Sequence, residues 1–182
     1  MAFGSVITYV PTFVADAHLG RVGVFFLAYT TAAVLSRVLG GGLGDAFERR
    51  TVILPMIGLL AASIAALALV HAPATLAMAG VGFGLAQGLS YPTLNAFAID
   101  QTGTDRLGRV QTFYNGAFNL GTTSGAMLLG GVVEAWGHRA MFGCAAGVAA
   151  LAFAVFQLGT TGALRPAARP PRSLDSAAPA AD

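Results

Sequence analysis

The chain alternates between long apolar runs and short polar connections. Val22 to Gly44 contains one charged residue, Arg37, and Thr51 to Ile99 contains none. A helix of roughly 20 apolar residues crosses the hydrocarbon layer of a membrane, which is about 30 Å thick. The runs therefore predict an all-α membrane protein with six transmembrane helices, at residues 2–14, 22–44, 51–70, 74–99, 110–133 and 140–158.

The first of these runs is shorter than the others. As a helix, residues 2–14 would measure about 20 Å, which is too short to cross a membrane comfortably. A signal peptide would begin with basic residues and would not precede five further apolar runs. We therefore expect a helix whose beginning is missing, because the gene model starts late or because the chain is one part of a larger protein.

Composition excludes several classes of protein. Of the 182 residues, 55% are hydrophobic and 10% are charged, whereas soluble domains contain about 25% charged residues. The net charge of +2 is too small to indicate a nucleic-acid partner. The single cysteine, Cys144, provides neither a disulfide framework nor a cysteine-rich metal site. All ten basic residues are Arg, which favours a bacterium with a GC-rich genome.

The placement of Arg predicts the orientation in the membrane, because cytoplasmic connections are enriched in basic residues. If the chain begins on the cytoplasmic side, the inner connections are 45–50, 100–109 and the tail, and they hold seven Arg. The outer connections hold two, Arg21 and Arg139. We therefore expect a multi-pass protein of the bacterial inner membrane. Its tail, 161–182, is rich in Pro, Ala and Arg and is predicted to be disordered and cytoplasmic.

The connection between the second and third apolar runs carries a dense charged motif, GGLGDAFERR. Its pattern of Gly41, Asp45, Arg49 and Arg50 resembles a signature loop of the major facilitator superfamily, which occurs between the second and third helices of each six-helix half. Ala46 and Glu48 depart from the family's basic residue and glycine. Because the second copy of this loop is commonly the degraded one, the resemblance implies the C-terminal half, helices seven to twelve, of a twelve-helix transporter.

The same motif is the site of a predicted cytoplasmic latch. Its glycines let the helix end approach a neighbour, and its carboxylate can accept hydrogen bonds from another helix or pair with a nearby Arg. Such a latch would hold one conformation and break in the other. The alternative is that these charges only fix the topology. The predicted latch residues are Gly41, Asp45, Arg49 and Arg50.

Small and polar residues form separate stripes along the fourth and fifth apolar runs. Small residues four apart allow helices to pack closely in lipid, and a proline kinks a helix. The predicted packing residues are Gly80, Gly84, Gly88, Pro92, Gly121 and Gly125. Polar side chains that share one helical face should not point at lipid. They would line a cavity or form hydrogen bonds with other helices. The polar stripes are Gln87, Tyr91 and Asn95, and Gln111, Asn115 and Asn119.

Two residues of the second apolar run complete the predicted cavity lining. Arg37 is a charged residue within a predicted span, and such residues are candidates for a functional site; alternatively its side chain reaches the cytoplasmic surface. Tyr29 lies eight residues earlier on the same face. No Asp or Glu falls near the middle of any predicted span, so a proton-carrying group would belong to a missing half of the transporter.

These features together favour a secondary transporter that moves a small solute by alternating access. Its expected partners are the lipid bilayer, a small-molecule substrate, and either a missing N-terminal six-helix half or a second copy. A six-span scaffold or channel-like protein that self-associates, and an inactive truncated product, remain alternatives. Convergence of the polar residues on one surface would favour transport, and their scattering would favour a scaffold. No enzyme motif, cofactor or metal site is expected. As substrates, sugars, drugs and amphipathic metabolites fit the predicted cavity about equally well.

Overall fold

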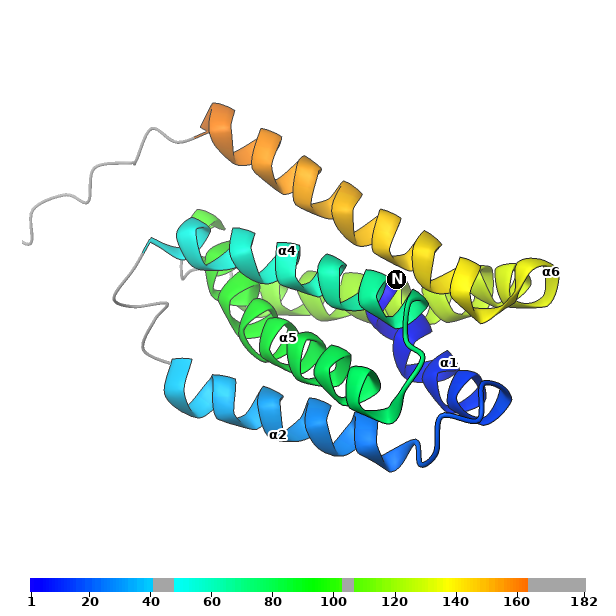
Figure 1. Cartoon of the computed structure of the whole chain (residues 1–182). Coiled ribbons are helices and arrows are strands. Elements are labelled where there is room, and N and C mark those ends of the chain that lie inside the picture. The colour runs from blue at the N-terminus through cyan, green and yellow to red at the C-terminus, as the bar shows by residue number, and fades with distance from the viewer. Residues whose placement is uncertain (41–47, 103–106, 164–182) are drawn as a thin grey trace, which may run out of the picture.

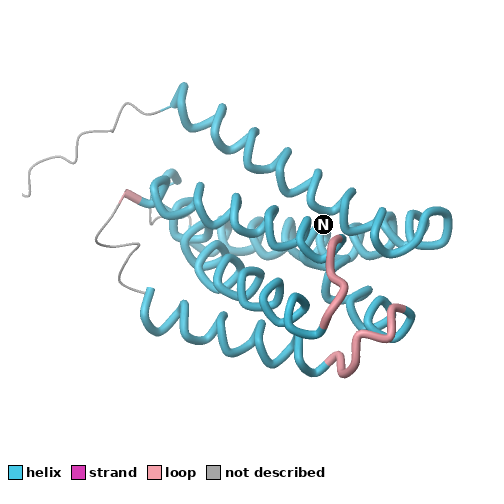
Figure 2. Tube along the Cα trace, viewed as in Figure 1, coloured by secondary structure: helices cyan, strands magenta, loops and turns pink. Residues whose placement is uncertain are grey.

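The computed structural model describes residues 1–40, 48–102 and 107–163. Helices account for nearly all of these residues, and no strand occurs among them, as Figure 2 shows. The described helices are α1 (Ala2–Asp16), α2 (Gly23–Gly40), α4 (Arg49–Ala68), α5 (Pro73–Thr102) and α6 (Leu107–Ala163). The all-α fold class predicted from the sequence is therefore confirmed.

The helices run back and forth between the two ends of a bundle (Figure 1). The long helix α6 is interrupted at Gly137, whose φ of 81° and ψ of 173° are not helical. A positive φ of this size is readily adopted only by glycine. The chain turns there, so that the two arms of α6 lie on either side of Gly137, where the apolar runs 110–133 and 140–158 were expected.

Three helical stretches are long and apolar enough to cross a membrane by length and composition. They are Gly23–Gly40, Arg49–Ala68 and Leu107–Thr160, and the last has 54 residues. Helix α1 has only 15 residues, which is fewer than the roughly 20 that a crossing needs. Helix α5 is long enough with 30 residues, but its glycines and polar side chains lower its hydropathy. The count of six crossings therefore stays a prediction.

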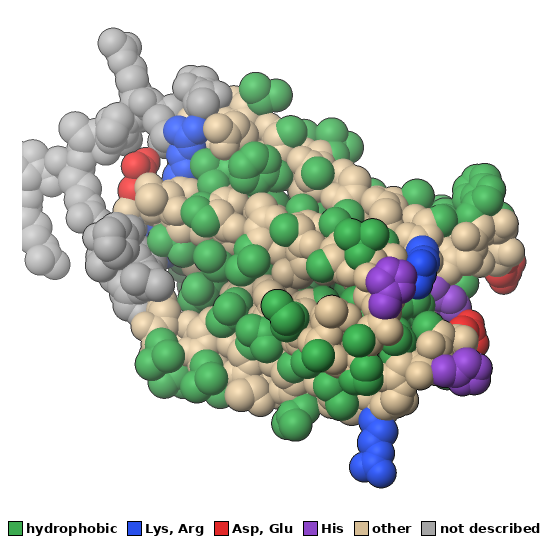
Figure 3. Space-filling view, in the orientation of Figure 1, with side chains coloured by type: hydrophobic (Ala, Val, Ile, Leu, Met, Phe, Trp, Pro, Cys, Tyr) green, Lys and Arg blue, Asp and Glu red, His purple; other side chains and the backbone are tan. Residues whose placement is uncertain are grey.

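The surface of the bundle is apolar between two charged ends (Figure 3). Large hydrophobic side chains are widely exposed, including Leu27, Val38, Met127 and Trp136, each more than 70% accessible. A protein in water rarely exposes contiguous apolar surface on this scale, whereas lipid covers such a surface at no cost. The chain is an integral membrane protein.

Tight packing is concentrated at one end of the bundle. The buried core joins Val10 and Phe13 of α1 to Leu67 of α4, Leu76 of α5 and Phe142 of α6. Phe13 and Phe142 meet edge to face, with ring centroids 5.2 Å apart. All these residues lie towards the end where α1 stops and α6 turns.

Helix α5 approaches α2 through its glycines. A Cβ added at Gly80 would lie 2.9 Å from the carbonyl oxygen of Phe25, and one at Gly88 would lie 2.7 Å from that of Ala33. At Gly84, an added Cβ would collide with the carbonyl oxygen of Tyr29. Because a β-carbon needs more room than this, the α2–α5 contact requires glycine at all three positions.

Glycines of α6 make a similar approach to the beginning of α1. A Cβ at Gly121 would lie 3.1 Å from the backbone nitrogen of Met1, and one at Gly125 would collide with the Met1 backbone. Pro92 lies inside α5 on an exposed face, and the helix continues through it to Thr102. The five glycines expected to pack are thus distributed over two different interfaces, and Pro92 belongs to neither.

We expect Gly84→Ala to lower the stability of the bundle by about 1–3 kcal/mol, the usual cost of overfilling a packed interface. The matched control is Gly147→Ala in α6, because a Cβ there meets nothing within 4 Å. Thermal unfolding of the two purified variants in detergent measures the change in stability that each substitution causes. Equal melting temperatures for the two variants would contradict the close α2–α5 contact.

Candidate functional site

A cavity of about 230 Å³ lies within the bundle, beside the beginning of α1. Helices α1, α4, α5 and both arms of α6 contribute to its wall. Most of the lining is apolar, and its polar part comes from α5 and the first arm of α6. The lining residues are Met1, Ala2, Phe3, Ile57, Leu60, Gln87, Ser90, Tyr91, Leu94, Tyr114, Phe118, Val148, Ala149 and Ala152.

One face of α5 supplies the polar wall of this cavity. Residues three or four positions apart lie on the same side of a helix. The lining residues of α5 have this spacing, and they are Gln87, Ser90, Tyr91 and Leu94. Gln87 is 8% exposed and Ser90 is 4% exposed. The Oγ of Ser90 is buried without a hydrogen-bond partner. The Gln87 amide also forms no hydrogen bond with any described residue. These are free polar groups inside a membrane-embedded bundle.

Aromatic side chains held by hydrogen bonds form a second part of the wall. The Tyr91 hydroxyl donates to Oδ1 of Asn115 at 2.7 Å, and the Tyr114 hydroxyl donates to the Tyr91 carbonyl oxygen at 2.8 Å. The Tyr91 ring lies 5.2 Å from the Tyr114 ring and 4.9 Å from the Phe118 ring, measured between centroids. Helix α5 is thereby fixed to the first arm of α6 at the cavity.

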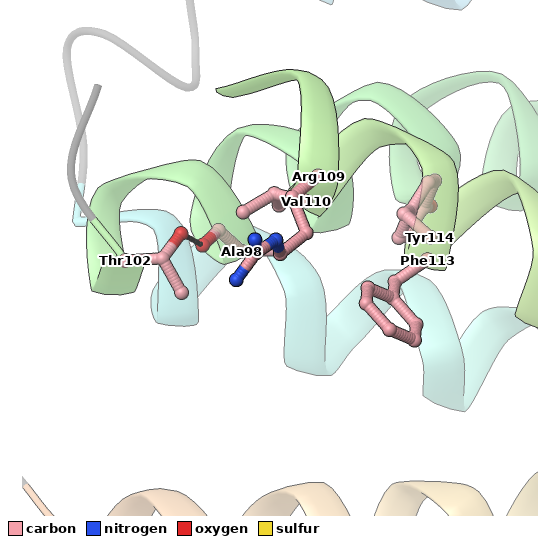
Figure 4. Close-up of a pocket in the computed structure, with 6 residues that line it drawn as sticks. All are labelled: Ala98, Thr102, Arg109, Val110, Phe113 and Tyr114. Carbon is pink, nitrogen blue, oxygen red and sulfur yellow. Dashed lines mark hydrogen bonds between the residues drawn. The ribbon is translucent and has the colours of Figure 1, made fainter. Parts of the chain in front are cut away.

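A second cavity, of about 440 Å³, lies between the end of α5 and the beginning of α6 (Figure 4). Arg109 and Thr102 line it, and the Thr102 hydroxyl donates to the Ala98 carbonyl oxygen at 2.8 Å. Tyr114 lines both cavities. The two spaces therefore adjoin at this tyrosine, one near a charged end of the bundle and the other deeper inside it.

The remaining residues of the predicted cavity do not line the space that contains Gln87. Tyr29 packs against Phe83 with ring centroids 5.6 Å apart. Arg37 is exposed, and its Nε donates to the Gly88 carbonyl oxygen at 3.4 Å. Asn95 has a buried Oδ1 without a partner. Gln111 and Asn119 are exposed on α6. The structure thus brings Gln87, Tyr91 and Asn115 together and leaves the others apart.

The predicted latch is described only in part, because Gly41 and Asp45 lie outside the described residues. Arg49 at the start of α4 forms an ion pair with Asp100 near the end of α5, and the Nε of Arg50 is buried without a partner. The pair connects two helix ends at the same side of the bundle. The side chain of Arg49 is 26% exposed and that of Asp100 is 55% exposed, so solvent screens their attraction.

The other end of the bundle carries its own polar contacts. The Nδ1 of His138 lies 3.4 Å from a carboxylate oxygen of Asp16, and its Nε2 lies 2.9 Å from the Thr12 hydroxyl. Nearby, Nη2 of Arg139 lies 3.0 Å from Nδ1 of His71. Within the described part of the chain, no three His, Cys, Asp or Glu side chains are placed to hold a metal ion.

Three residues of the site were not selected from the sequence. Ser90 follows Gln87 by three residues and so shares its helical face. Tyr114 precedes Asn115 in a polar segment and would have been found by the same periodicity. Asp100 marks the end of an apolar run, but its pairing with Arg49 requires α4 and α5 to be adjacent, which the sequence does not reveal.

We expect Tyr91→Phe to cost about 0.5–1.5 kcal/mol, because it removes the hydrogen bond to Asn115. Tyr29→Phe is the matched control, since the Tyr29 hydroxyl forms no hydrogen bond with any described residue. Unfolding of both variants under the same conditions separates the loss of the hydrogen bond from the loss of an oxygen atom. If Tyr29→Phe were the more damaging change, the assignment of these contacts would be wrong.

The Arg49–Asp100 pair should contribute a coupling energy below about 1 kcal/mol, as exposed ion pairs do. A double-mutant cycle with Arg49→Gln and Asp100→Asn measures this energy, and 1 M salt should reduce it. A larger coupling that does not respond to salt would show that the pair is buried in the membrane-embedded protein.

Comparison with known proteins identifies the family. The model of the Major Facilitator Superfamily matches residues 1–180. The chain is 28% identical over 157 residues to a protein of Bacillus subtilis (strain 168) described as the uncharacterized MFS-type transporter YwfA. The match covers 84% of this chain and 38% of that protein, so the chain spans well under half the length of this relative. The resemblance carried by the GGLGDAFERR motif is confirmed, and the chain belongs to the Major Facilitator Superfamily.

Proposed function

We propose that the chain forms a six-helix half of a secondary transporter that moves a small solute across a bacterial inner membrane by alternating access. The observation that carries this proposal is the polar α5 wall of the cavity, where Gln87 lies beside Ser90 and the Oγ of Ser90 is buried without a hydrogen-bond partner. Polar groups in a membrane-embedded bundle are costly to leave unsatisfied and mark substrate pathways. Family membership supports the same conclusion.

The second six-helix bundle would be supplied by an N-terminal half or by a second copy of this chain. In such transporters two bundles rock against each other around a site near the middle of the membrane. The chain's match to 38% of its relative's length supports a division of this kind. The end that carries Arg49 and Arg109 would face the cytoplasm, together with the tail, in keeping with the Arg distribution of the whole sequence.

The latch would act at that cytoplasmic end. Arg49 and Asp100 tie α4 to α5, and the glycine-rich connection with Gly41 and Asp45 would engage the other bundle. Formation of this contact would stabilise one of the two conformations, and its rupture would accompany the other. Arg50, whose Nε is buried without a partner, is available to the same network.

Alternating access can be tested by chemical labelling before the substrate is known. The exposed Cys144 is first replaced by Ala, and Ser90→Cys then places a thiol at the cavity wall. We expect a membrane-impermeant maleimide to label it from either side, because alternating access opens the cavity to each side of the membrane in turn. Right-side-out and inside-out vesicles from bacteria expressing the protein provide access to the two sides.

Ser63→Cys in α4 is the control, because Ser63 is 5% exposed but does not line either cavity. It should remain unlabelled under all conditions. If Ser90→Cys were equally unreactive from both sides, a scaffold would be the better description. Simultaneous labelling from both sides, together with an ion leak through reconstituted vesicles, would instead establish a channel-like protein.

A further inference from the structure

Pro92 leaves one backbone carbonyl of α5 without its regular partner. In an α-helix each carbonyl accepts a hydrogen bond from the N–H four residues later, and a proline has no N–H. The carbonyl that loses its partner here is that of Gly88, and α5 nevertheless continues without a break to Thr102. Because lipid supplies no donor, neighbouring groups must satisfy a carbonyl that is freed in this way inside a membrane-embedded bundle.

The donor to this carbonyl comes from the neighbouring helix α2. The Nε of Arg37 donates to the Gly88 carbonyl oxygen at 3.4 Å. Two neighbouring hydroxyls do not serve it, because that of Ser36 donates to the Ala33 carbonyl oxygen at 2.9 Å and that of Ser90 has no partner. Among the described residues, Arg37 is therefore the one side chain that bonds to the freed carbonyl.

The missing side chain at Gly88 permits this contact. A Cβ there would collide with the Ser36 hydroxyl and would lie 2.7 Å from the Ala33 carbonyl oxygen. Helix α2 thus lies directly on the backbone of α5 at this turn (Figure 1). Arg37 follows Ser36 in the chain, and at this separation its side chain can reach a backbone oxygen of α5. Close approach, proline and arginine therefore coincide at one turn of α5.

The other prolines within helices have no such donor. Pro11 in α1 frees the carbonyl of Ile7, and Pro55 in α4 frees the carbonyl of Thr51. In the part of the chain that the structure describes, no side chain donates to either carbonyl. The arginine opposite Pro92 is therefore not a general consequence of proline in these helices.

We propose that Arg37 acts as a clasp on the proline site of α5. Its guanidinium supplies the donor that Pro92 lacks, and it thereby holds against α2 the segment that carries Gln87 and Tyr91. Charged side chains within membrane proteins pair with one another or with backbone carbonyls, and Arg37 forms no ion pair with a described carboxylate. Arg37 is thus a positioning residue for the cavity wall, which it does not itself line.

Substitutions that separate the donor group from the charge test this role. Arg37→Gln keeps an N–H donor at the same position along the side chain and removes the charge, whereas Arg37→Met keeps only the length. We expect Arg37→Met to lower the melting temperature of the purified chain in nanodiscs by about 2–4 °C, the shift that one ordinary hydrogen bond produces in a protein of this size. Arg37→Gln should lose less than half as much. A larger loss in Arg37→Gln, or none in Arg37→Met, would overturn the clasp.

Removal of the proline provides a second comparison. Pro92→Ala restores a backbone N–H to the Gly88 carbonyl, so Arg37→Met should cost less than half as much in this background as in the unmodified chain. Pro55→Ala is the matched control, because Pro55 is also exposed within a helix but frees a carbonyl that no described side chain serves. There the full loss should persist. Undiminished loss in the Pro92→Ala background, or an equal reduction in both backgrounds, would contradict the proposal.

Hydrogen exchange shows whether the clasp holds α5 in place. Peptides from residues 85–96 should exchange faster in Arg37→Met than in the unmodified chain, while peptides from residues 56–66 of α4 should not change. Unchanged exchange in α5 would refute the positioning role, even if Pro92→Ala failed to fold. None of these measurements involves a substrate. Their failure would therefore leave alternating access standing, and a failed labelling experiment would leave the clasp standing.

Discussion

The constraint on which this structure depends is that hydrocarbon provides no partner for a backbone amide or carbonyl group. A chain that passes through lipid must satisfy these groups within itself, and a helix does so along its whole length. The described residues accordingly form helices almost throughout, with loops at the ends of the bundle. Charged side chains gather at those same ends, where water and lipid headgroups can solvate them.

Within this frame, close packing rather than apolar burial decides how the helices are arranged. Lipid tails are as apolar as leucine, so that helices associate where their backbones can approach one another. One face of α5 lies directly on the backbone of α2 because it carries no β-carbon at Gly80, Gly84 and Gly88. This contact fixes the rotation of α5 about its axis. Gln87, Ser90 and Tyr91 then face the interior between α1 and α6 instead of lipid.

Core packing and hydrogen bonds hold the helices around the cavity. Helix α1 packs through Val10 and Phe13 into the core near the α6 turn. The hydrogen bonds of Tyr91 and Tyr114 hold α5 against the first arm of α6 beside the cavity. Polar side chains of α5 are thereby held at the cavity wall by contacts between residues far apart in the sequence.

The sequence alone determined the fold class, because apolar runs of membrane-spanning length can satisfy their backbones only as helices. The apolar runs at 51–70 and 74–99 overlap α4 at Arg49–Ala68 and α5 at Pro73–Thr102. The motif with Arg49 and Arg50 led to the correct family. Periodicity was also enough to group Gln87 with Tyr91, because residues four apart share a helical face.

Tertiary structure decided which of the polar stripes meet. Asn115 reaches Tyr91, whereas Gln111 and Asn119 on the same helix remain exposed, because only part of α6 passes beside the cavity. Tyr29 joins an aromatic cluster with Phe83, and Arg49 pairs with Asp100, 51 residues away in sequence. Helical periodicity fixes which side chains share a face, but the neighbour that each face meets depends on how close two backbones can come, and that is a property of the packed helices together.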